Sequence, residues 1–270
     1  MKRRVASLGM YDVPAVQWAN DRIWAVLAER LRAAGMADVP EALDRSRTLN
    51  ALWDDPDLLF GQSCGYPLMT AYRDRLLHVA TPSYAVPGCV AGGYRSRIVV
   101  RAEDPVEALS ELRGRRAAMN DRQSNSGMNL FRAAVAPLAG GRPFFTAVVE
   151  MGSHAASVQA VIDGVADVAA IDAVSFAHLQ RDDPAGAARV RTIAWTEATA
   201  GLPFVTGAGT RDDEVRLLRA ALAETLADPE TAAARDALFI DGLARLSLRR
   251  YGHILTLERR AVRAGYPVLG

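Results

Sequence analysis

Short apolar runs that end in small polar turns and continue into helical patterns recur along this chain of 270 residues. The clearest example is the stretch 119–130, where an apolar strand ends in Asn-Asp-Arg-Gln-Ser-Asn-Ser-Gly and a helical pattern begins at Leu130. A second example is the buried run 168–171, which ends at Asp172 before the next helical pattern. Strand–turn–helix units with short connections are typical of α/β folds with mainly parallel sheets. We therefore predict an α/β fold.

Other parts of the chain give less regular predictions. The amphipathic pattern over 15–34 predicts a long helix, and a proline at the first helical position predicts a second helix over 106–112. We expect the proline-rich stretch 81–88 to form a loop. The part of the chain after position 210 should be mostly helical.

Charge and composition exclude several classes of function. A net charge of +1 gives no general attraction to nucleic acid or to an anionic membrane, and no apolar run is long enough to span a bilayer. The four histidines and the two cysteines, Cys64 and Cys89, do not have metal-ligand spacing. We therefore expect no metal and no cofactor, and the sequence alone leaves open whether the two cysteines form a disulfide.

The N-terminus bears on where the protein works. Met-Lys-Arg-Arg has the charge of the first region of a signal peptide, but the apolar run behind it is short and broken by polar residues. As written, the chain is therefore expected to be cytoplasmic. It would be periplasmic if the printed start is that of a mature or shortened chain.

Polar side chains collect at the ends of several predicted strands. Ligands of parallel α/β sheets bind beyond the carboxyl ends of the strands, and a helix start offers unpaired N–H groups and partial positive charge to an anion. The same side chains could instead cap helices. We predict that these residues line a shared cleft for a small anion: Tyr11, Ser63, Tyr66, Ser124, Asn125, Ser126, His154 and Asp172.

Two of these candidates have alternative roles that the sequence does not separate. His154 could donate a hydrogen bond to an anion from a ring nitrogen, or it could support a neighbouring group. Asp172 follows a fully apolar strand, where a carboxylate needs a partner. It could receive an ammonium or hydroxyl group of a ligand, or it could only cap the next helix.

The order of several motifs resembles the family of solute-binding proteins that serve phosphate, phosphite and phosphonate ABC transporters. The resemblance is dense over roughly residues 92–205. The motifs that carry it are Tyr94–Arg101, Leu112-Arg113-Gly114, Asn120-Asp121, Ser124–Gly127, Gly152-Ser153-His154, Ala160-Val161 and Asp163–Asp172.

This resemblance implies a two-lobed type II periplasmic-binding-protein fold with crossover hinge strands. Lobe I would contain residues 1–92 and 197–270, and lobe II would contain residues 93–196. Ligand would bind in the interlobe cleft, with the serine-rich turn and the histidine holding phosphonate oxygens. The family turn usually carries threonine between its serines, where this chain has Asn125.

Our first hypothesis is therefore that the protein binds a small anionic or zwitterionic ligand, phosphonate-, phosphate- or carboxylate-like, without catalysing a reaction. It would be the solute-binding component of an ABC-type uptake system, with an ABC permease as partner, or a relative without a signal peptide. The alternatives are a cytoplasmic enzyme on the same fold, such as a menaquinone-pathway-like lyase that uses His154 and Asp172 as acid and base, and a small-molecule sensor.

Overall fold

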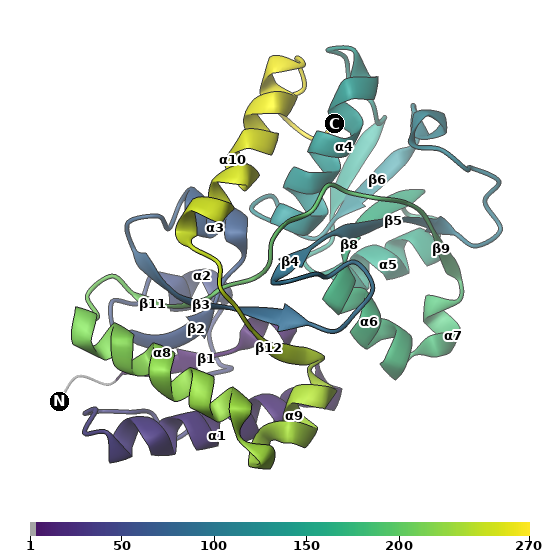
Figure 1. The fold of residues 1–270 in the computed structure, drawn as a ribbon. Helices are drawn as coiled ribbons and strands as arrows, with labels where there is room; N and C mark the ends of the chain where they lie inside the picture. The colour runs from purple at the N-terminus through teal and green to yellow at the C-terminus, as the bar shows by residue number, and fades with distance from the viewer. Residues whose placement is uncertain (1–3) are drawn as a thin grey trace. The chain divides into compact units, whose positions relative to one another are not determined.

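The chain forms two compact units, which we describe from a computed structural model of residues 4–270 (Figure 1). The first unit comprises the chain up to Ala85 together with Val90–Gly92 and Gly201–Leu248. The second unit comprises Val86–Cys89, Gly93–Ala200 and Arg249–Gly270. Each unit is therefore assembled from segments that are far apart in the sequence.

The first unit is built on a five-stranded mixed sheet. Its parallel pair consists of the two strands nearest the N-terminus, and the other neighbouring strands are antiparallel. In spatial order the strands are β1 (Val5–Ser7), β2 (Leu58–Gln62), β11 (Phe204–Gly207), β3 (Leu76–Tyr84) and β12 (Ile240–Ala244). Strand β11 enters from a distant part of the sequence and separates β2 from β3.

Helices cover this sheet with their apolar faces. On α1 (Gln17–Ala33), the buried Ile23, Leu27 and Leu31 recur every four residues, which places them on one face. Figure 1 shows α1 beside α8 (Asp212–Ala227) and α9 (Ala232–Ala237), which it contacts. The remaining helical segments are η1 (Gly9–Tyr11), η2 (Pro14–Val16), α2 (Leu49–Trp53), α3 (Gly65–Met69) and η5 (Pro229–Thr231).

The second unit also has a five-stranded mixed sheet. Strand β6 runs parallel to both β7 and β8, whereas β5 is antiparallel to β8 and β9. In spatial order the strands are β7 (Ala147–Glu150), β6 (Arg116–Met119), β8 (Val168–Asp172), β5 (Ser96–Arg101) and β9 (Val190–Trp195). A short antiparallel ribbon joins β4 (Gly93–Tyr94) to β10 (Thr199–Ala200).

The two faces of this second sheet have different neighbours. Val99 of β5 belongs to an apolar cluster with Val158 of α5 (His154–Ile162) and Phe176 of α6 (Ala173–Asp182). Ser96 lies three positions earlier on the same strand, and residues an odd number of positions apart along a strand point to opposite faces. Its Oγ donates to the carbonyl of Ser126, in the segment η4 (Asn125–Asn129). The helical segments of the unit are η3 (Leu109–Leu112), η4 (Asn125–Asn129), α4 (Leu130–Ala139), α5 (His154–Ile162), α6 (Ala173–Asp182), α7 (Pro184–Ala187) and α10 (Leu248–Arg263).

The C-terminal segment from residue 249 packs within the second unit. Asn129 donates from Nδ2 to the carbonyl of Ile254, and the amide of Phe144 donates to the carbonyl of Gly270 at 2.7 Å. The sequence-based division had assigned all of 197–270 to lobe I. An amphipathic pattern shows that a helix has an apolar face but not which part of the chain covers it. The division of the chain into lobes at residues 92 and 197 remains a prediction.

The predicted α/β class is confirmed, but β5, β11 and β12 pair antiparallel to their neighbours and make both sheets mixed. An apolar run that is buried on both faces of a sheet is recognisable as a strand in the sequence. The run does not show whether the neighbouring strands lie parallel or antiparallel to it. The predicted predominance of parallel pairing therefore does not hold for these ladders.

Three predicted elements differ from the structure. In place of a helix over 106–112 there is only the single turn η3, because Asp104 Oδ1 accepts the amide of Val106 and Ala108 is extended. Residues 81–84, expected in a loop, continue strand β3 through their pairing with β12. The segment β12 itself lies in a region that was expected to be mostly helical. In both of the latter cases a pairing between distant segments decided the local structure.

Candidate functional site

The polar turn before α4 is itself helical and has π-type geometry. Ser124 caps it: its Oγ accepts the amide of Gly127 at 3.0 Å, and its carbonyl accepts the amide of Asn129, five residues later, at 3.0 Å. π-helical turns are rare in proteins, and those that occur are often found at functional sites. The helical segment therefore begins at Asn125 and not at Leu130, so Ser126 and Gly127 lie in its first turn.

Two serines and a histidine from separate elements meet at this helix start. Ser126 Oγ lies 2.8 Å from His154 Nε2, and Ser124 Oγ lies 3.3 Å from Ser126 Oγ. Both serines are buried. His154 is the first residue of α5, whose N-cap Ser153 accepts the amide of Ala156 at 3.1 Å. We call Ser124, Ser126 and His154 the Ser–His cluster.

His154 is neutral at pH 7 because burial of the ring lowers its pKa to about 4. The residue as a whole keeps some exposure, but its Nδ1 atom is buried and has no hydrogen-bond partner in the described part of the chain. A neutral ring carries its proton on one nitrogen only. When that nitrogen is Nε2, it donates to Ser126 Oγ, and the hydroxyl hydrogen of Ser126 is then available to an anion.

Gly127 allows the backbone to approach this cluster closely. A Cβ atom at this position would lie 1.9 Å from Asn120 Oδ1 and 3.3 Å from His154 Cε1. Asn120 Oδ1 is buried without a hydrogen-bond partner among the described residues. Asn120 was not among the predicted site residues, although its position directly after strand β6 was the signal that could have identified it.

Asn125 holds the turn in place through its own side chain. Its Nδ2 donates to Tyr94 Oη at 2.9 Å and to Thr199 Oγ1 at 3.0 Å, and its Oδ1 accepts from Asn129 Nδ2 at 3.0 Å. The side chain is fully buried. These contacts fix η4 to the β4–β10 ribbon. Sequence reasoning did not identify Thr199 in this role, because it lies 74 residues from Asn125.

Asp172 caps helix α6. Its Oδ1 accepts the amides of Val174 and Ser175, both at 2.8 Å, and the residue is only 2% exposed. The thiol pKa of Cys89 is raised to about 12, mainly because the thiol is buried and further by the negative charge of Asp172. The capping role is therefore present, and a contact of Asp172 with a ligand remains a prediction.

The other three predicted residues lie in the first unit. Ser63 is fully buried and its Oγ donates to the carbonyl of Cys64 at 3.1 Å. The ring of Tyr11 packs edge-on against Tyr84 with centroids 5.4 Å apart, and Tyr66 is a partly exposed residue of α3. The structure thus brings Ser124, Ser126 and His154 into contact within the second unit. A shared role for Tyr11, Ser63 and Tyr66 remains a prediction.

Two further sequence-based expectations concern the chain as a whole. Among the described helices, none is both long enough and apolar enough to cross a membrane. Cys64 and Cys89 are both thiols in this structure.

Several solved structures share this fold. A binding-protein component of a phosphonate ABC transporter from Pseudomonas aeruginosa superposes with a TM-score of 0.75 at 16% identity, covering 97% of this chain and 88% of that one. PhnD1 of Prochlorococcus marinus in complex with methylphosphonate gives 0.74 at 14% identity, with 97% and 100% covered. A Xanthomonas citri protein bound to chloride gives 0.71 at 17% identity, with 97% and 98% covered. These likenesses confirm a periplasmic-binding-protein fold.

Sequence comparison identifies the family directly. No curated protein matches the sequence closely enough to count as a relative. Residues 55–251, which are most of the chain, match the sequence model of the periplasmic substrate-binding protein of phosphonate ABC transporters. This match confirms the resemblance that the motifs over 92–205 indicated. The chain belongs to the family of periplasmic substrate-binding proteins of phosphonate ABC transporters.

Proposed function

We propose that this protein binds a small phosphonate or a closely related oxyanion through the Ser–His cluster and catalyses no reaction. The observation that carries this proposal is the approach of Ser126 Oγ to His154 Nε2 at 2.8 Å, with Ser124 Oγ within 3.3 Å of Ser126. Hydroxyl groups and a helix start are suited to the oxygens of a tetrahedral anion.

The ligand would be held by hydrogen bonds and by the partial charge of the helix start. None of the three side chains of the cluster carries a positive charge at pH 7, because the pKa of His154 is lowered to about 4. A hydrogen bond from a neutral donor to a charged oxygen contributes about 1.5–3 kcal/mol. The close approach of Gly127 to Asn120 and His154 keeps the backbone near this position.

The enzyme alternative has less support. A histidine with a pKa of about 4 is poorly matched to proton transfer near pH 7. Asp172 Oδ1 already accepts two amides of α6. Members of the family are the substrate-binding proteins of ABC transporters, so their role is to bind a substrate. We therefore assign binding to this protein, with an ABC permease as its partner.

Calorimetric titration tests the proposal. Methylphosphonate, inorganic phosphate and malonate would be titrated into the wild type and into the double variant Ser124→Ala/Ser126→Ala. Each lost hydrogen bond should weaken the binding of the preferred ligand by about tenfold to a hundredfold. Ser110→Ala, a change at an exposed serine of η3, is the matched control and should leave the affinity unchanged. Thermal unfolding of each variant separates a loss of binding from a loss of fold. Unchanged affinity in a folded double variant would return this turn to a capping role only.

Localisation needs its own test. The family is periplasmic, and we propose that this protein works in the periplasm. Cells that express the untagged chromosomal gene would be fractionated, and the product would be weighed by mass spectrometry. Recovery in the periplasm supports uptake by an ABC permease, and recovery of the full chain only in the cytoplasm contradicts it.

A further inference from the structure

Arg97 of strand β5 lies between two aromatic rings. Its guanidinium carbon is 4.9 Å from the centroid of Phe176, on α6, and 4.5 Å from that of Trp195, on β9. Its neighbour Ser96 donates to the carbonyl of Ser126, so the two side chains point to opposite faces of the sheet. Arg97 therefore belongs to the face remote from the Ser–His cluster.

No carboxylate neutralises this guanidinium in the described part of the chain. Within the described residues, its one hydrogen bond runs from Nη1 to Thr192 Oγ1 at 3.3 Å. Its Nε atom is buried and has no partner among the described residues. Burial lowers the pKa of Arg97, which nevertheless stays charged. A partly desolvated cation with unused N–H donors is a recognition group for an anion.

A cavity of about 300 Å³ lies beside this side chain. Its wall is about half polar and half apolar, Gln180 and Thr192 supply an amide and a hydroxyl, and none of the lining residues is acidic. We call this cavity the Arg97 pocket. Its lining residues are Arg97, Phe176, Gln180, Pro184, Ala187, Ala188, Val190 and Thr192.

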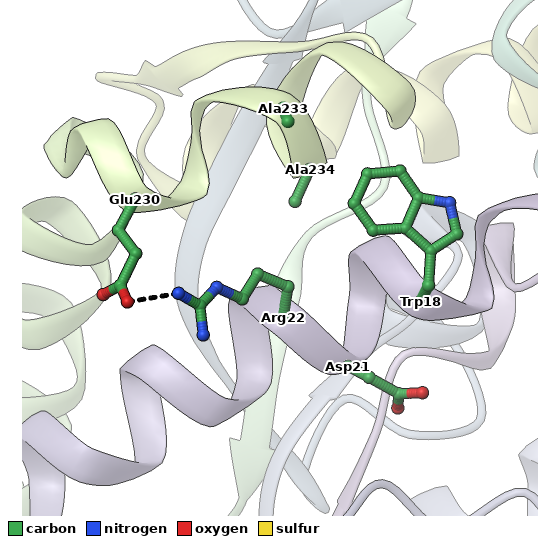
Figure 2. A pocket seen from close by; sticks show the side chains of 6 residues that line it. All are labelled: Trp18, Asp21, Arg22, Glu230, Ala233 and Ala234. Atoms are coloured by element: carbon green, nitrogen blue, oxygen red, sulfur yellow. Dashed lines mark hydrogen bonds and ion pairs between the residues drawn. The ribbon is translucent and has the colours of Figure 1, made fainter.

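Two cavities of the first unit that are lined by arginine lack this property. Figure 2 shows the cavity of about 620 Å³ beside Trp18, where Arg22 forms an ion pair with Glu230. In another cavity, Arg45 bonds Asp12 and Asp21. The other two arginines of that cavity, Arg4 and Arg47, also form ion pairs with carboxylates, so in both cavities the protein already neutralises the cations. The guanidinium of Arg97 has no such partner in the described structure.

We propose that the Arg97 pocket binds a small monocarboxylate with a short apolar group. A guanidinium presents parallel N–H donors that match the two oxygens of one carboxylate. The apolar wall at Phe176 and Val190 would cover the remainder of such a molecule. A phosphonate suits the pocket less, because it carries up to two negative charges and the lining supplies a single positive charge, that of Arg97.

The indole of Trp195 provides a local readout, because its ring stacks on Arg97. Benzoate would be titrated into ¹⁵N-labelled protein while the Trp195 indole N–H signal, assigned with Trp195→Phe, is followed by NMR. We expect a saturable shift, and Arg97→Gln should raise the apparent Kd at least about tenfold through loss of the charged donor. Arg97→Lys keeps the positive charge but lacks the paired N–H donors of the guanidinium, so it should raise the Kd for benzoate by an intermediate amount. This variant also tests the proposal if Arg97→Gln does not fold.

Two controls make the experiment decisive. Arg113 also stacks on an aromatic ring, 4.8 Å from Phe144, but it bonds the carbonyl of Leu138, so Arg113→Gln should leave benzoate binding unchanged. Ser124→Ala/Ser126→Ala should also leave it unchanged. The proposal is overturned if no saturable shift occurs, if Arg97→Gln binds benzoate like the wild type, or if the serine variant loses the shift. An equally large response to inorganic phosphate would overturn the carboxylate assignment.

Discussion

The Ser–His cluster and the Arg97 pocket lie on opposite faces of one sheet and offer an anion different chemistry. The cluster presents neutral hydroxyl and imidazole groups at a helix start. The pocket presents a permanent cation between two aromatic rings, beside a wall that is about half apolar. Adjacent residues of β5, Ser96 and Arg97, contribute to the two sites separately.

The two proposed sites would separate two kinds of anion recognition within one protein. Neutral donors with fixed geometry discriminate by the number and direction of oxygens, since each oxygen must find its own hydrogen bond. A guanidinium attracts any nearby carboxylate, and the shape of the apolar wall then selects the rest of the molecule.

Gly127→Ala should damage the cluster and spare the pocket. The new Cβ would lie 1.9 Å from Asn120 Oδ1, and overpacking of this kind costs about 1–3 kcal/mol of stability. Affinity for methylphosphonate should fall by roughly tenfold or more as the cluster atoms move apart. Chemical denaturation and calorimetry measure both quantities.

The control for this substitution is Gly252→Ala in α10, where a Cβ meets nothing within 4 Å. It should be neutral or slightly stabilising, as expected for Gly→Ala within a helix. Adding Asn120→Ala to Gly127→Ala should recover part of the lost stability. A Gly127→Ala variant with wild-type stability and affinity would show that the close approach does not matter.

Acidification should destabilise the wild type relative to a His154→Asn variant. The folded-state pKa of His154 is lowered to about 4, so between pH 6.5 and pH 4 the unfolded chain binds the proton more strongly. The stability that the neutral ring contributes is present above pH 6.5 and is lost as the pH falls toward 4. At pH 5 this linkage should lower the free energy of unfolding of the wild type by about 1–2 kcal/mol relative to the variant.

Urea unfolding of both proteins at several pH values measures this difference. His78 and His178 also have pKa values lowered to about 4, and they are present in both proteins, so their contributions cancel. A wild-type-minus-variant difference that does not change between pH 7 and pH 5 would mean that His154 is not desolvated.

Asp172→Asn should separate the capping role from a ligand contact. Asparagine caps helices about as well as aspartate, so the stability should change by less than about 1 kcal/mol. If the carboxylate meets the ammonium group of a ligand, affinity for 2-aminoethylphosphonate should fall about tenfold. Ethylphosphonate, which lacks the amine, should bind equally well or more tightly. Equal losses for both ligands in matched titrations would exclude the contact.

Salt should weaken binding at the pocket more than at the cluster. Raising sodium chloride from about 20 mM to about 500 mM screens the attraction between a partly exposed guanidinium and a carboxylate. Benzoate affinity should therefore fall a few-fold. Methylphosphonate affinity should change less, because the cluster has no cation. A stronger salt effect on methylphosphonate would show that a cation contributes to that site.

The sequence was sufficient to predict the α/β class and the family, and three of its candidate residues, Ser124, Ser126 and His154, lie in contact in the structure. Alternation of apolar runs with polar turns is a local property, and it identified the strand end at 116–119 and the helix after it. The polar content of the turn identified Ser124 and Ser126, and a second strand–turn–helix unit identified His154.

Only the tertiary structure decided which of these groups meet. Residues 28 positions apart, Ser126 and His154, form a hydrogen bond, and β12 exists because a distant strand pairs with it. The charge of Arg97 is visible in the sequence, whereas only the structure shows that no carboxylate among residues 4–270 pairs with it. Local patterns fix which atoms a segment exposes, but partners come from segments that chain packing brings together, and that packing depends on the burial of the whole apolar surface.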